Sequence, residues 1–338
     1  MDLNNLWFVI LAFLLAGYAV LDGFDLGVGI LIAAVRGDRE RRLLLNSIGP
    51  HWDGNEVWLI TFGAAMFAAF PNAYAAVFSG FYTAFMLLLF ALIFRAVAIE
   101  FRGKRQSEGW RIFWDGSFCA ASLLATLLFG VAAGNIVAGI PVNDQGLFVG
   151  GFATLIPPYP ILIGLLTVFT ALMHGATFLY LKTEGHLQEI TLRWVLRGQG
   201  MALIWYVLTG ILTWFLTPGA AHNLQKQPWC WGIVILILLA FVGVRWALSL
   251  KRPLGAFLCS SLAILGLIFL FAFSLYPNLV ISSLSASYNL NIFNAASSAK
   301  TLKIMAIIAF SGMPLVLFYT IFIYRAFRGK VRISEHSY

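Results

Sequence analysis

The chain has 338 residues, of which 61% are apolar and only 11% charged, with a mean hydropathy of +0.87. A water-soluble globule usually has about a quarter of its residues charged, so this composition excludes a soluble domain and indicates a polytopic membrane protein. The net charge of +8 does not indicate nucleic-acid binding, because the basic residues are scattered over short loops and form no basic face. The cysteines Cys119, Cys230 and Cys259 match no ligand spacing, so we expect no metal site.

Nine segments carry the roughly 20 apolar residues that a helix needs to cross a hydrocarbon core of about 30 Å. They predict an all-α polytopic membrane protein, folded as a single transmembrane domain over residues 1–338. The predicted spans lie near residues 6–35, 43–70, 73–99, 116–140, 159–181, 198–216, 229–250, 254–276 and 302–327. The second span contains Pro50, which cannot donate a backbone hydrogen bond, so we expect a break there that packs against protein or water.

The distribution of lysine and arginine predicts the orientation of the chain. Alternate connections and the C-terminal tail hold 18 of the 22 basic residues, and the opposite face holds only Lys226, Lys300 and Lys303. Basic loops stay on the cytoplasmic side, so we expect the N-terminus outside and the C-terminus inside. Arg95, within the third span, completes the count.

Carboxylates gather in the inner half of the predicted spans. Asp53 lies about 10 residues into the second span, roughly 15 Å deep at 1.5 Å per residue, and Asp25 lies at a comparable depth in the first. Asp22 and Asp25 are three residues apart, as are Asp53 and Glu56, so each pair can face a common interior. An ionisable residue at such a depth is a candidate functional residue.

Two interpretations of these acids remain open. They carry protons, or they pair structurally with Arg95 and the loop arginines. We expect Arg95 to pair with an acid of the Asp25 and Asp53 group. The candidate proton-pathway residues are Asp53, Asp25, Asp22, Glu56, Glu100 and Asp115, and the candidate supporting residues are His51, Trp52, Asn55, Trp58 and Arg95.

One histidine, His174, lies in the middle of the fifth predicted span. It has two interpretations, an axial haem ligand or a packing histidine whose ring nitrogens are satisfied within the protein, and the second is favoured. The Gly23-x-x-x-Gly27 and Gly130-x-x-x-Gly134 spacings are a weak signal for close helix packing.

Several motifs together give the chain a resemblance to a known family over nearly its whole length. They are Asp22-Gly-Phe-Asp-Leu-Gly27, the long run from Asn46 to Leu59, Phe94-Arg95, Trp114-Asp115, Gly134-Asn135, His174-Gly175 and Tyr319…Tyr324-Arg325. With these motifs the chain resembles subunit II of the cytochrome bd-type quinol oxidases.

The resemblance implies a bacterial inner-membrane heterodimer that couples quinol oxidation to the reduction of oxygen to water. The partner, subunit I, would hold haem b and haem d, and this chain would support it with two four-helix bundles plus one peripheral helix. The Asp53 position would then belong to a proton path from the cytoplasm. No catalytic residue is expected in this chain, which would not be active alone.

The resemblance also bears on cofactors and further partners. We expect this chain to bind no haem or metal, whereas some members of the family hold a structural quinone in this subunit, and no motif here decides that point. Membrane lipids, the quinol pool and a small single-helix subunit are further expected contacts of the complex.

Two rival functions make different predictions. A secondary transporter would also show a broken helix and carboxylates at mid-membrane depth, but it would need corresponding interruptions in two halves of the chain. A haem-binding subunit in its own right would show an absorbance band in the isolated chain.

Overall fold

The computed structural model describes residues 2–227 and 230–333 and is almost entirely helical. The helices are α1 (Leu3–Leu31), α2 (Asp38–Ile48), α3 (Trp52–Ala69), α4 (Pro71–Gly80), α5 (Tyr82–Arg102), α6 (Glu108–Ala138), α7 (Pro158–Lys182), α8 (Gly185–Leu216), α9 (Pro218–Lys226), α10 (Trp231–Ser249), α11 (Pro253–Leu275) and α12 (Ala299–Ala326). Two short strands, β1 (Asn278–Val280) and β2 (Leu290–Asn291), pair antiparallel between α11 and α12.

Eight helices in the described parts of the chain are long and apolar enough to cross a membrane. They are α1, α5, α6, α7, α8, α10, α11 and α12. Helix α3 is not among them, because Asp53, Asn55 and Glu56 occupy its first two turns and lower its mean hydropathy. The all-helical membrane fold predicted from composition is therefore confirmed.

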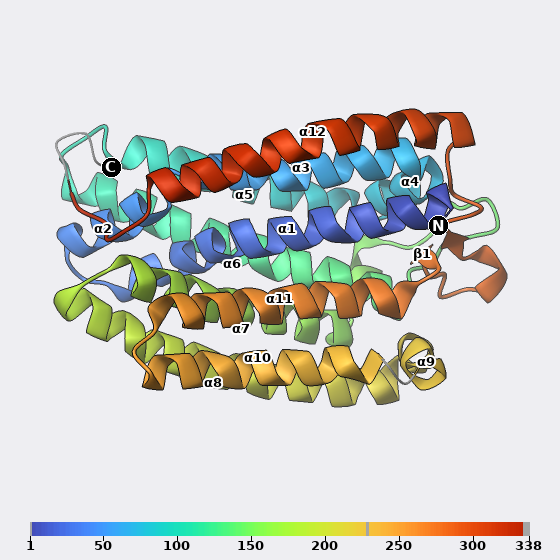
Figure 1. The fold of residues 1–338 in the computed structure, drawn as a ribbon. Coiled ribbons are helices and arrows are strands. Elements are labelled where there is room, and N and C mark those ends of the chain that lie inside the picture. Colours follow the sequence, from blue (N-terminus) through green and yellow to red (C-terminus); the bar gives the residue numbers. More distant parts are fainter. Residues whose placement is uncertain (1, 228–229, 334–338) are drawn as a thin grey trace.

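The helix break predicted at Pro50 is confirmed. Helix α2 ends at Ile48 and α3 begins at Trp52, with a turn closed by a hydrogen bond of 2.8 Å from the His51 N–H to the Ile48 carbonyl. The short α2 lies at the end of the molecule where α12 also ends (Figure 1).

Residues 73–99, expected as one membrane span, form two helices in the structure. Helix α4 ends at Gly80 and α5 begins at Tyr82, so the chain turns at Phe81. A Cβ at Gly80 would approach the Phe148 ring to 2.9 Å. The glycine therefore allows the ring of Phe148, which lies in a loop, to pack against the end of α4. Hydropathy does not detect this break, because the residues on both sides of it are apolar.

Two other helices begin well before their predicted spans. Helix α6 starts at Glu108, eight residues before the predicted boundary, and α8 starts at Gly185, thirteen residues before it. Hydropathy marks the part of a helix that suits lipid, whereas backbone hydrogen bonding continues into polar residues beyond it.

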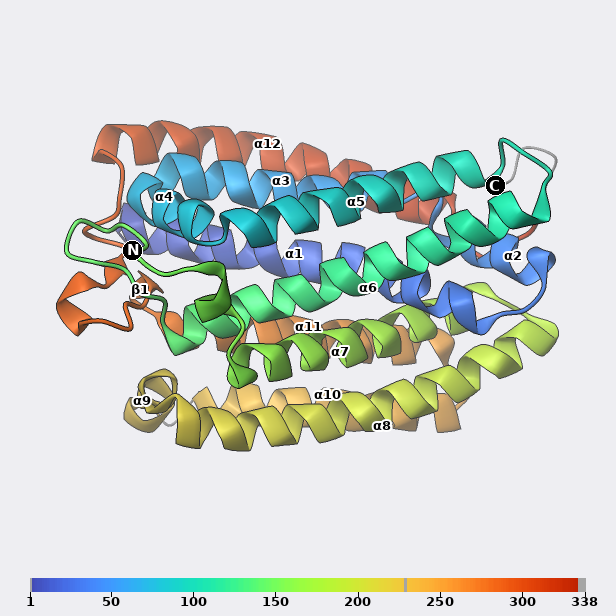
Figure 2. The ribbon, with the colours of Figure 1, turned by 180° about the vertical axis from the view of Figure 1, so that it is seen from behind.

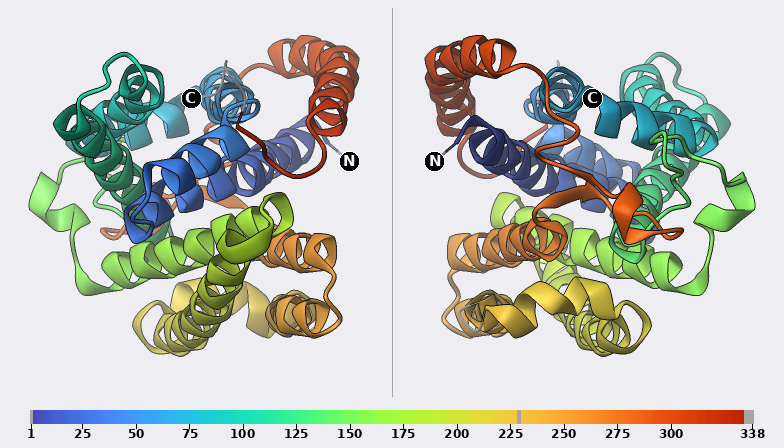
Figure 3. Two further views of the ribbon diagram at one scale, coloured as in Figure 1. Left: turned by 90° about the vertical axis from the view of Figure 1, so that its left-hand side faces the viewer. Right: turned by 90° about the vertical axis from the view of Figure 1, so that its right-hand side faces the viewer.

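The long helices run roughly along one axis (Figures 1 and 2). Helix α1 begins at the end of the molecule that carries the strands, and α12 ends at the opposite end (Figure 1). Viewed along the axis, α7, α8, α10 and α11 group together, whereas α12 lies at the edge against α1 and α3 (Figure 3). Helix α1 contacts α3, α6, α7, α11 and α12, so its side chains meet neighbours on almost every face.

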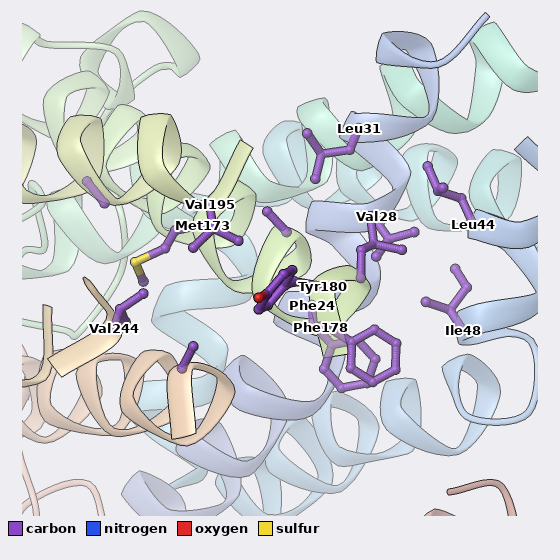
Figure 4. Close-up of a cluster of buried hydrophobic side chains, with 14 of the residues drawn as sticks. Phe24, Val28, Leu31, Leu44, Ile48, Met173, Phe178, Tyr180, Val195 and Val244 are labelled. Atoms are coloured by element: carbon purple, nitrogen blue, oxygen red, sulfur yellow. The ribbon is translucent and has the colours of Figure 1, made fainter. Parts of the chain in front are cut away.

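The main core lies where α1 crosses α7. The rings of Phe24 and Phe178 stack with centroids 4.0 Å apart, and Val28 faces Ile48 of α2 (Figure 4). A Cβ at Gly27 would lie 2.0 Å from a carbonyl oxygen of α7, so only glycine permits this approach. The packing role suggested by the glycine spacing is thus confirmed for Gly27, and the close approach fixes the acids of α1 relative to the other helices.

Candidate functional site

Three helices bring charged side chains together in the interior of the protein. The Arg95 guanidinium on α5 binds both carboxylate oxygens of Asp22 on α1, one of them at 2.9 Å. It also donates to Glu56 Oε1 on α3 at 2.9 Å. The Arg95 and Asp22 side chains are fully buried, and that of Glu56 is 22% exposed. With Asp25, these residues form what we call the buried cluster.

The expectation that Arg95 pairs with an acid of the Asp25 and Asp53 group is confirmed, and the structure shows which members of that group it binds. Its partners are Asp22 and Glu56 rather than Asp25 and Asp53. Asp22 lies three residues from Asp25, and Glu56 lies three residues from Asp53. Three residues along a helix correspond to about one turn and to a rotation of about 60° around its axis. Sequence spacing placed both acids on one face, and only the rotation of each helix in the packed structure selects which acid meets the arginine.

Asp25 is fully buried and has an amide as its hydrogen-bond partner. Asn55 Nδ2 on α3 donates to Asp25 Oδ2 at 2.7 Å and to the Leu21 carbonyl at 3.1 Å. The second oxygen, Oδ1, is buried and has no hydrogen-bond partner among the described residues. Asn55 Oδ1 in turn accepts a hydrogen bond of 3.1 Å from the Tyr324 hydroxyl on α12.

His51 lies beside this group, at the break between α2 and α3. Its ring stacks on that of Tyr324, with centroids 4.3 Å apart and planes inclined by 17°. The residue is 3% exposed, and neither ring nitrogen has a hydrogen-bond partner among the described residues. A buried imidazole without partners is costly unless water reaches it.

Two of the candidate acids lie on the surface of this chain. Asp53 is exposed in the first turn of α3, and Glu100 is exposed near the end of α5. Asp53 shares its face of α3 with Val57 and Ile60, which are 49% and 69% exposed. The chain alone therefore presents an acid at the end of an apolar face.

Asp115 belongs to a different group of charges. It accepts hydrogen bonds from Arg102 Nε at 2.5 Å and from Arg41 at 3.0 Å. Arg102 also binds Asp38 at 2.8 Å, and Arg111 binds Asp38 at 3.2 Å. This end network of Asp38, Asp115, Arg41, Arg102 and Arg111 ties α2, α5 and α6 together at the end that holds most basic residues.

Asp38 lies outside the long apolar segments and titrates within the end network. Partial burial raises its pKa, but the hydrogen bond and charge of Arg102, with the charge of Arg111, outweigh burial and hold the pKa below its ordinary value. The network therefore favours the ionised carboxylate.

The two supporting tryptophans pack α3 against its neighbours. Trp58 is 6% exposed, and its indole lies so close to α1 that a Cβ at Gly17 would come within 2.3 Å of it. Trp52 is partly buried against the main core. Both residues thus fix the position of α3, and through it those of Glu56 and Asn55.

His174 has both ring nitrogens within hydrogen-bond distance of protein atoms. They lie 2.7 Å from the Ser260 hydroxyl and 2.9 Å from the Val20 carbonyl oxygen. The ring also stacks on Phe257. The packing interpretation of this histidine is confirmed, because these bonds occupy both nitrogens that could bind iron.

Sequence reasoning missed Tyr324 as a site residue and treated Arg102 as a loop residue. Tyr324 lies more than 260 residues from Asn55, so no local spacing reveals their hydrogen bond. Arg102 is one of the 18 basic residues that the sequence assigns to the alternate connections and the C-terminal tail, yet it is 3% exposed. Arg102 lies near Asp38 at the start of α2 only because the helices pack together, so no local pattern in the sequence indicates this contact.

Comparison with known proteins gives a consistent result over the whole chain. A family model described as cytochrome bd terminal oxidase subunit II matches residues 3–327. Cytochrome bd-I ubiquinol oxidase subunit 2 of Escherichia coli K12 is 35% identical, with 97% of this chain and 95% of the relative covered. Cytochrome bd ubiquinol oxidase subunit 2 of Bacillus subtilis is also 35% identical, with coverages of 99% and 98%.

A solved structure shows a similar fold. A chain of the bd oxidase from Geobacillus thermodenitrificans superposes with a TM-score of 0.81, covering 97% of this chain and 99% of that one. Its sequence identity of 18% means that this likeness speaks for the fold alone.

Proposed function

The chain belongs to the cytochrome bd terminal oxidase subunit II family, and from this premise we propose that it conducts protons from the cytoplasm to the haem-bearing subunit of its complex. It is subunit II of a bd-type quinol oxidase, an oxidoreductase that couples quinol oxidation to the reduction of oxygen to water. Family membership removes the secondary transporter as an alternative. The interruptions found in the described residues at Pro50 and Phe81 also lie in the first third of the chain rather than in two corresponding halves.

The proposed architecture has nine membrane crossings, in two four-helix bundles with one peripheral helix. The eight apolar helices and α3 supply the crossings. In this arrangement α7, α8, α10 and α11 form one bundle, α1, α3, α5 and α6 form the other, and α12 is peripheral. The opposite positions of the start of α1 and the end of α12 support an odd number of crossings (Figure 1).

The proposed orientation in the bacterial inner membrane has the N-terminus outside and the C-terminus in the cytoplasm. Its support is the enrichment of lysine and arginine in alternate connections. In this orientation the end network and the break before α3 face the cytoplasm. The exposed apolar faces of α8, α10 and α12 would then contact lipid.

The proton role depends chiefly on one observation, the position of Asp53. This acid is exposed at the end of an apolar face of α3, and it acts electrostatically on Glu56 of the buried cluster. A carboxylate at such a place is costly against lipid, so another protein or water must cover it. We therefore assign this face to the haem-bearing subunit, with Asp53 delivering protons there and Asp25 in support.

The proposed division of labour leaves haem b and haem d to the partner subunit. Those haems supply the electron transfer and oxygen chemistry of the complex. This chain holds its partner in place and relays protons, and the hydrogen bonds at His174 agree with that division.

The substitution Asp53→Asn tests the proton role, because the amide has nearly the same shape as the acid but carries no proton. We expect the complex to assemble with its pigments while quinol-dependent oxygen consumption falls, most at high pH, where protons are scarce. Loss of a positioned proton carrier typically slows a reaction about 10² to 10⁴-fold. The matched control is Asp144→Asn, an exposed acid on the opposite side, and unchanged turnover of Asp53→Asn at every pH would refute the proposal.

Cysteine labelling tests the proposed orientation. Single cysteines at Asp144 and Gln225 should react with an impermeant reagent from outside, and those at Arg39 and Gly329 only from the cytoplasm. Labelling from the reverse side at any of these positions would contradict the arrangement.

A further inference from the structure

Four polar side chains form a continuous column from the helix break to the middle of α1. His51 immediately precedes α3, and Asn55 lies one turn further along that helix. Tyr324 of α12 contacts both of them, stacking on His51 and donating a hydrogen bond to Asn55. Asn55 then donates to Asp25 at 2.7 Å. We call His51, Tyr324, Asn55 and Asp25 the polar column.

The charges around Asp25 do not balance if every acid is ionised. Three carboxylates, those of Asp22, Asp25 and Glu56, share the single guanidinium of Arg95. Arg95 directs both of its terminal nitrogens to Asp22 and Glu56, so Asp25 has no cationic hydrogen-bond partner there. Burying an unpaired carboxylate costs several kcal/mol, whereas a neutral carboxyl group avoids that cost.

The groups that face Asp25 come from four helices. They are Asp22 of its own helix, Arg95 of α5, Asn55 and Glu56 of α3, and Tyr324 of α12. Asp22 and Glu56 are carboxylates and Arg95 is a cation. If both of those acids are ionised, the net charge of the three groups is negative, and it repels a further negative charge on Asp25. Asp25 Oδ1 is buried and has no hydrogen-bond partner in residues 2–227 and 230–333, which leaves this oxygen to hold a proton.

At the other end of the polar column, the His51 ring also needs a partner with which it can exchange a proton. Within the described parts of the chain, neither buried ring nitrogen of His51 has a hydrogen-bond partner, although at least one of them carries a hydrogen. The nearby charge is Lys182 of α7, which donates to the Phe327 carbonyl at 2.6 Å and acts on His51 only electrostatically. His51 lies at the interruption between α2 and α3, and a buried imidazole without protein partners needs water as its hydrogen-bond partner.

We propose that Asp25 stores a proton in the resting protein and is reloaded from the cytoplasmic side through His51 and water along the polar column. Asp25 Oδ1 releases its proton to water on the way to the partner subunit and becomes a carboxylate. A proton from the cytoplasm then passes His51 and restores the carboxyl group, so one proton leaves, one enters and no electron moves. Tyr324 and Asn55 position the carboxyl without changing protonation themselves.

This inference deepens the proposed proton conduction and rests on it, but it assigns a separate role to Asp25. Asp53 delivers protons at the surface of α3, whereas Asp25 holds one in the interior. The two roles can therefore fail independently.

Infrared spectroscopy of the purified complex tests the storage role. The wild-type complex should show the carbonyl band of a protonated carboxyl group, and the band should shift when the solvent is exchanged for D₂O. The band should disappear in Asp25→Asn and persist in Asp53→Asn. A band that persists in Asp25→Asn overturns the storage role even if Asp53→Asn has lost turnover, whereas unchanged turnover in Asp53→Asn alone counts only against the surface role.

Turnover of the same variants gives an independent result. Asp25→Asn should retain full haem content and lose roughly 10² -fold in oxygen consumption, the lower end of the effect of a positioned proton carrier. Loss of haem in Asp25→Asn would show that the acid is structural and would overturn the inference.

The entry role of His51 remains testable if Asp25→Asn does not assemble. We expect His51→Gln to keep its haems while the D₂O shift of the carbonyl band slows at least severalfold. The control His186→Gln replaces an exposed histidine on the same side and should exchange at the wild-type rate.

Tyr324→Phe should slow turnover less than His51→Gln, with Tyr319→Phe, an exposed tyrosine on the same helix, as its control. An unchanged exchange rate in His51→Gln overturns the proposed route.

Discussion

The buried cluster and the end network are built from the same residue types, but in opposite proportions. The buried cluster sets three acids against Arg95, whereas the end network sets Arg41, Arg102 and Arg111 against two acids. Asp22 and Arg95 are fully buried, while Asp38 and Arg111 are 44% and 33% exposed. Surplus carboxylates in the interior require protons or water, whereas surplus arginines that are partly exposed meet solvent. The buried cluster is therefore suited to binding and releasing protons, and the end network is suited to holding α2, α5 and α6 together.

The largest expected effect comes from removing the single cation of the buried cluster. Arg95→Leu leaves Asp22 and Glu56 without their ion-pair partner, which costs about 3–5 kcal/mol for a buried pair. We expect the complex to lose assembly, measured as haem bound per purified complex. The double variant Arg95→Leu with Asp22→Leu should recover part of the lost assembly. Normal assembly of Arg95→Leu alone would show that the buried cluster is not held together by charge.

An intermediate effect is expected from the buried acid of the end network. Asp115→Asn keeps the shape but weakens charge-assisted hydrogen bonds to Arg102 and Arg41, so we expect a loss of about 1–3 kcal/mol. The loss should appear as a lower thermal midpoint with little change in turnover per assembled complex. If Asp115→Asn instead assembles normally and slows turnover, the end network also handles protons and the contrast between the two regions fails.

The smallest effect concerns Asp38, whose folded-state pKa lies below its ordinary value. A lowered pKa means that the ionised form adds stability above the ordinary pKa of 3.8, and that this stability is lost as the pH falls through the folded-state value. Because this carboxylate is 44% exposed, its contribution is at most about 1 kcal/mol. The stability difference between wild type and Asp38→Asn should thus be constant from pH 5 to 8 and vanish only in stronger acid. A difference that already declines near neutral pH would sink this assignment.

Spacing and motif together identified most of the candidate site, but not its connections. The i, i+3 pairs predicted an interior position for Asp22, Asp25, Asp53 and Glu56, and this prediction is wrong for Asp53, which is exposed. The lone charge of Arg95 required a buried partner there. The residues that complete the polar column come from α3 and α12, which are separated by most of the chain. No pattern within one helix specifies which distant helix will lie against it.

The sequence by itself determined the class of the protein, the approximate positions of most apolar helices, the presence of acids within apolar segments and the break at Pro50. Each of these follows from local physics: lipid demands apolar length, a buried charge demands a partner, and proline removes a backbone donor. The tertiary structure alone decided that Arg95 meets Asp22 and Glu56, that Asp25 meets an amide, and that Asp53 points outward. The physical reason is that helix rotation is set by packing, as where Gly27 meets α7 and Trp58 lies against Gly17, and a rotation of about 60° exchanges one acid of a pair for the other.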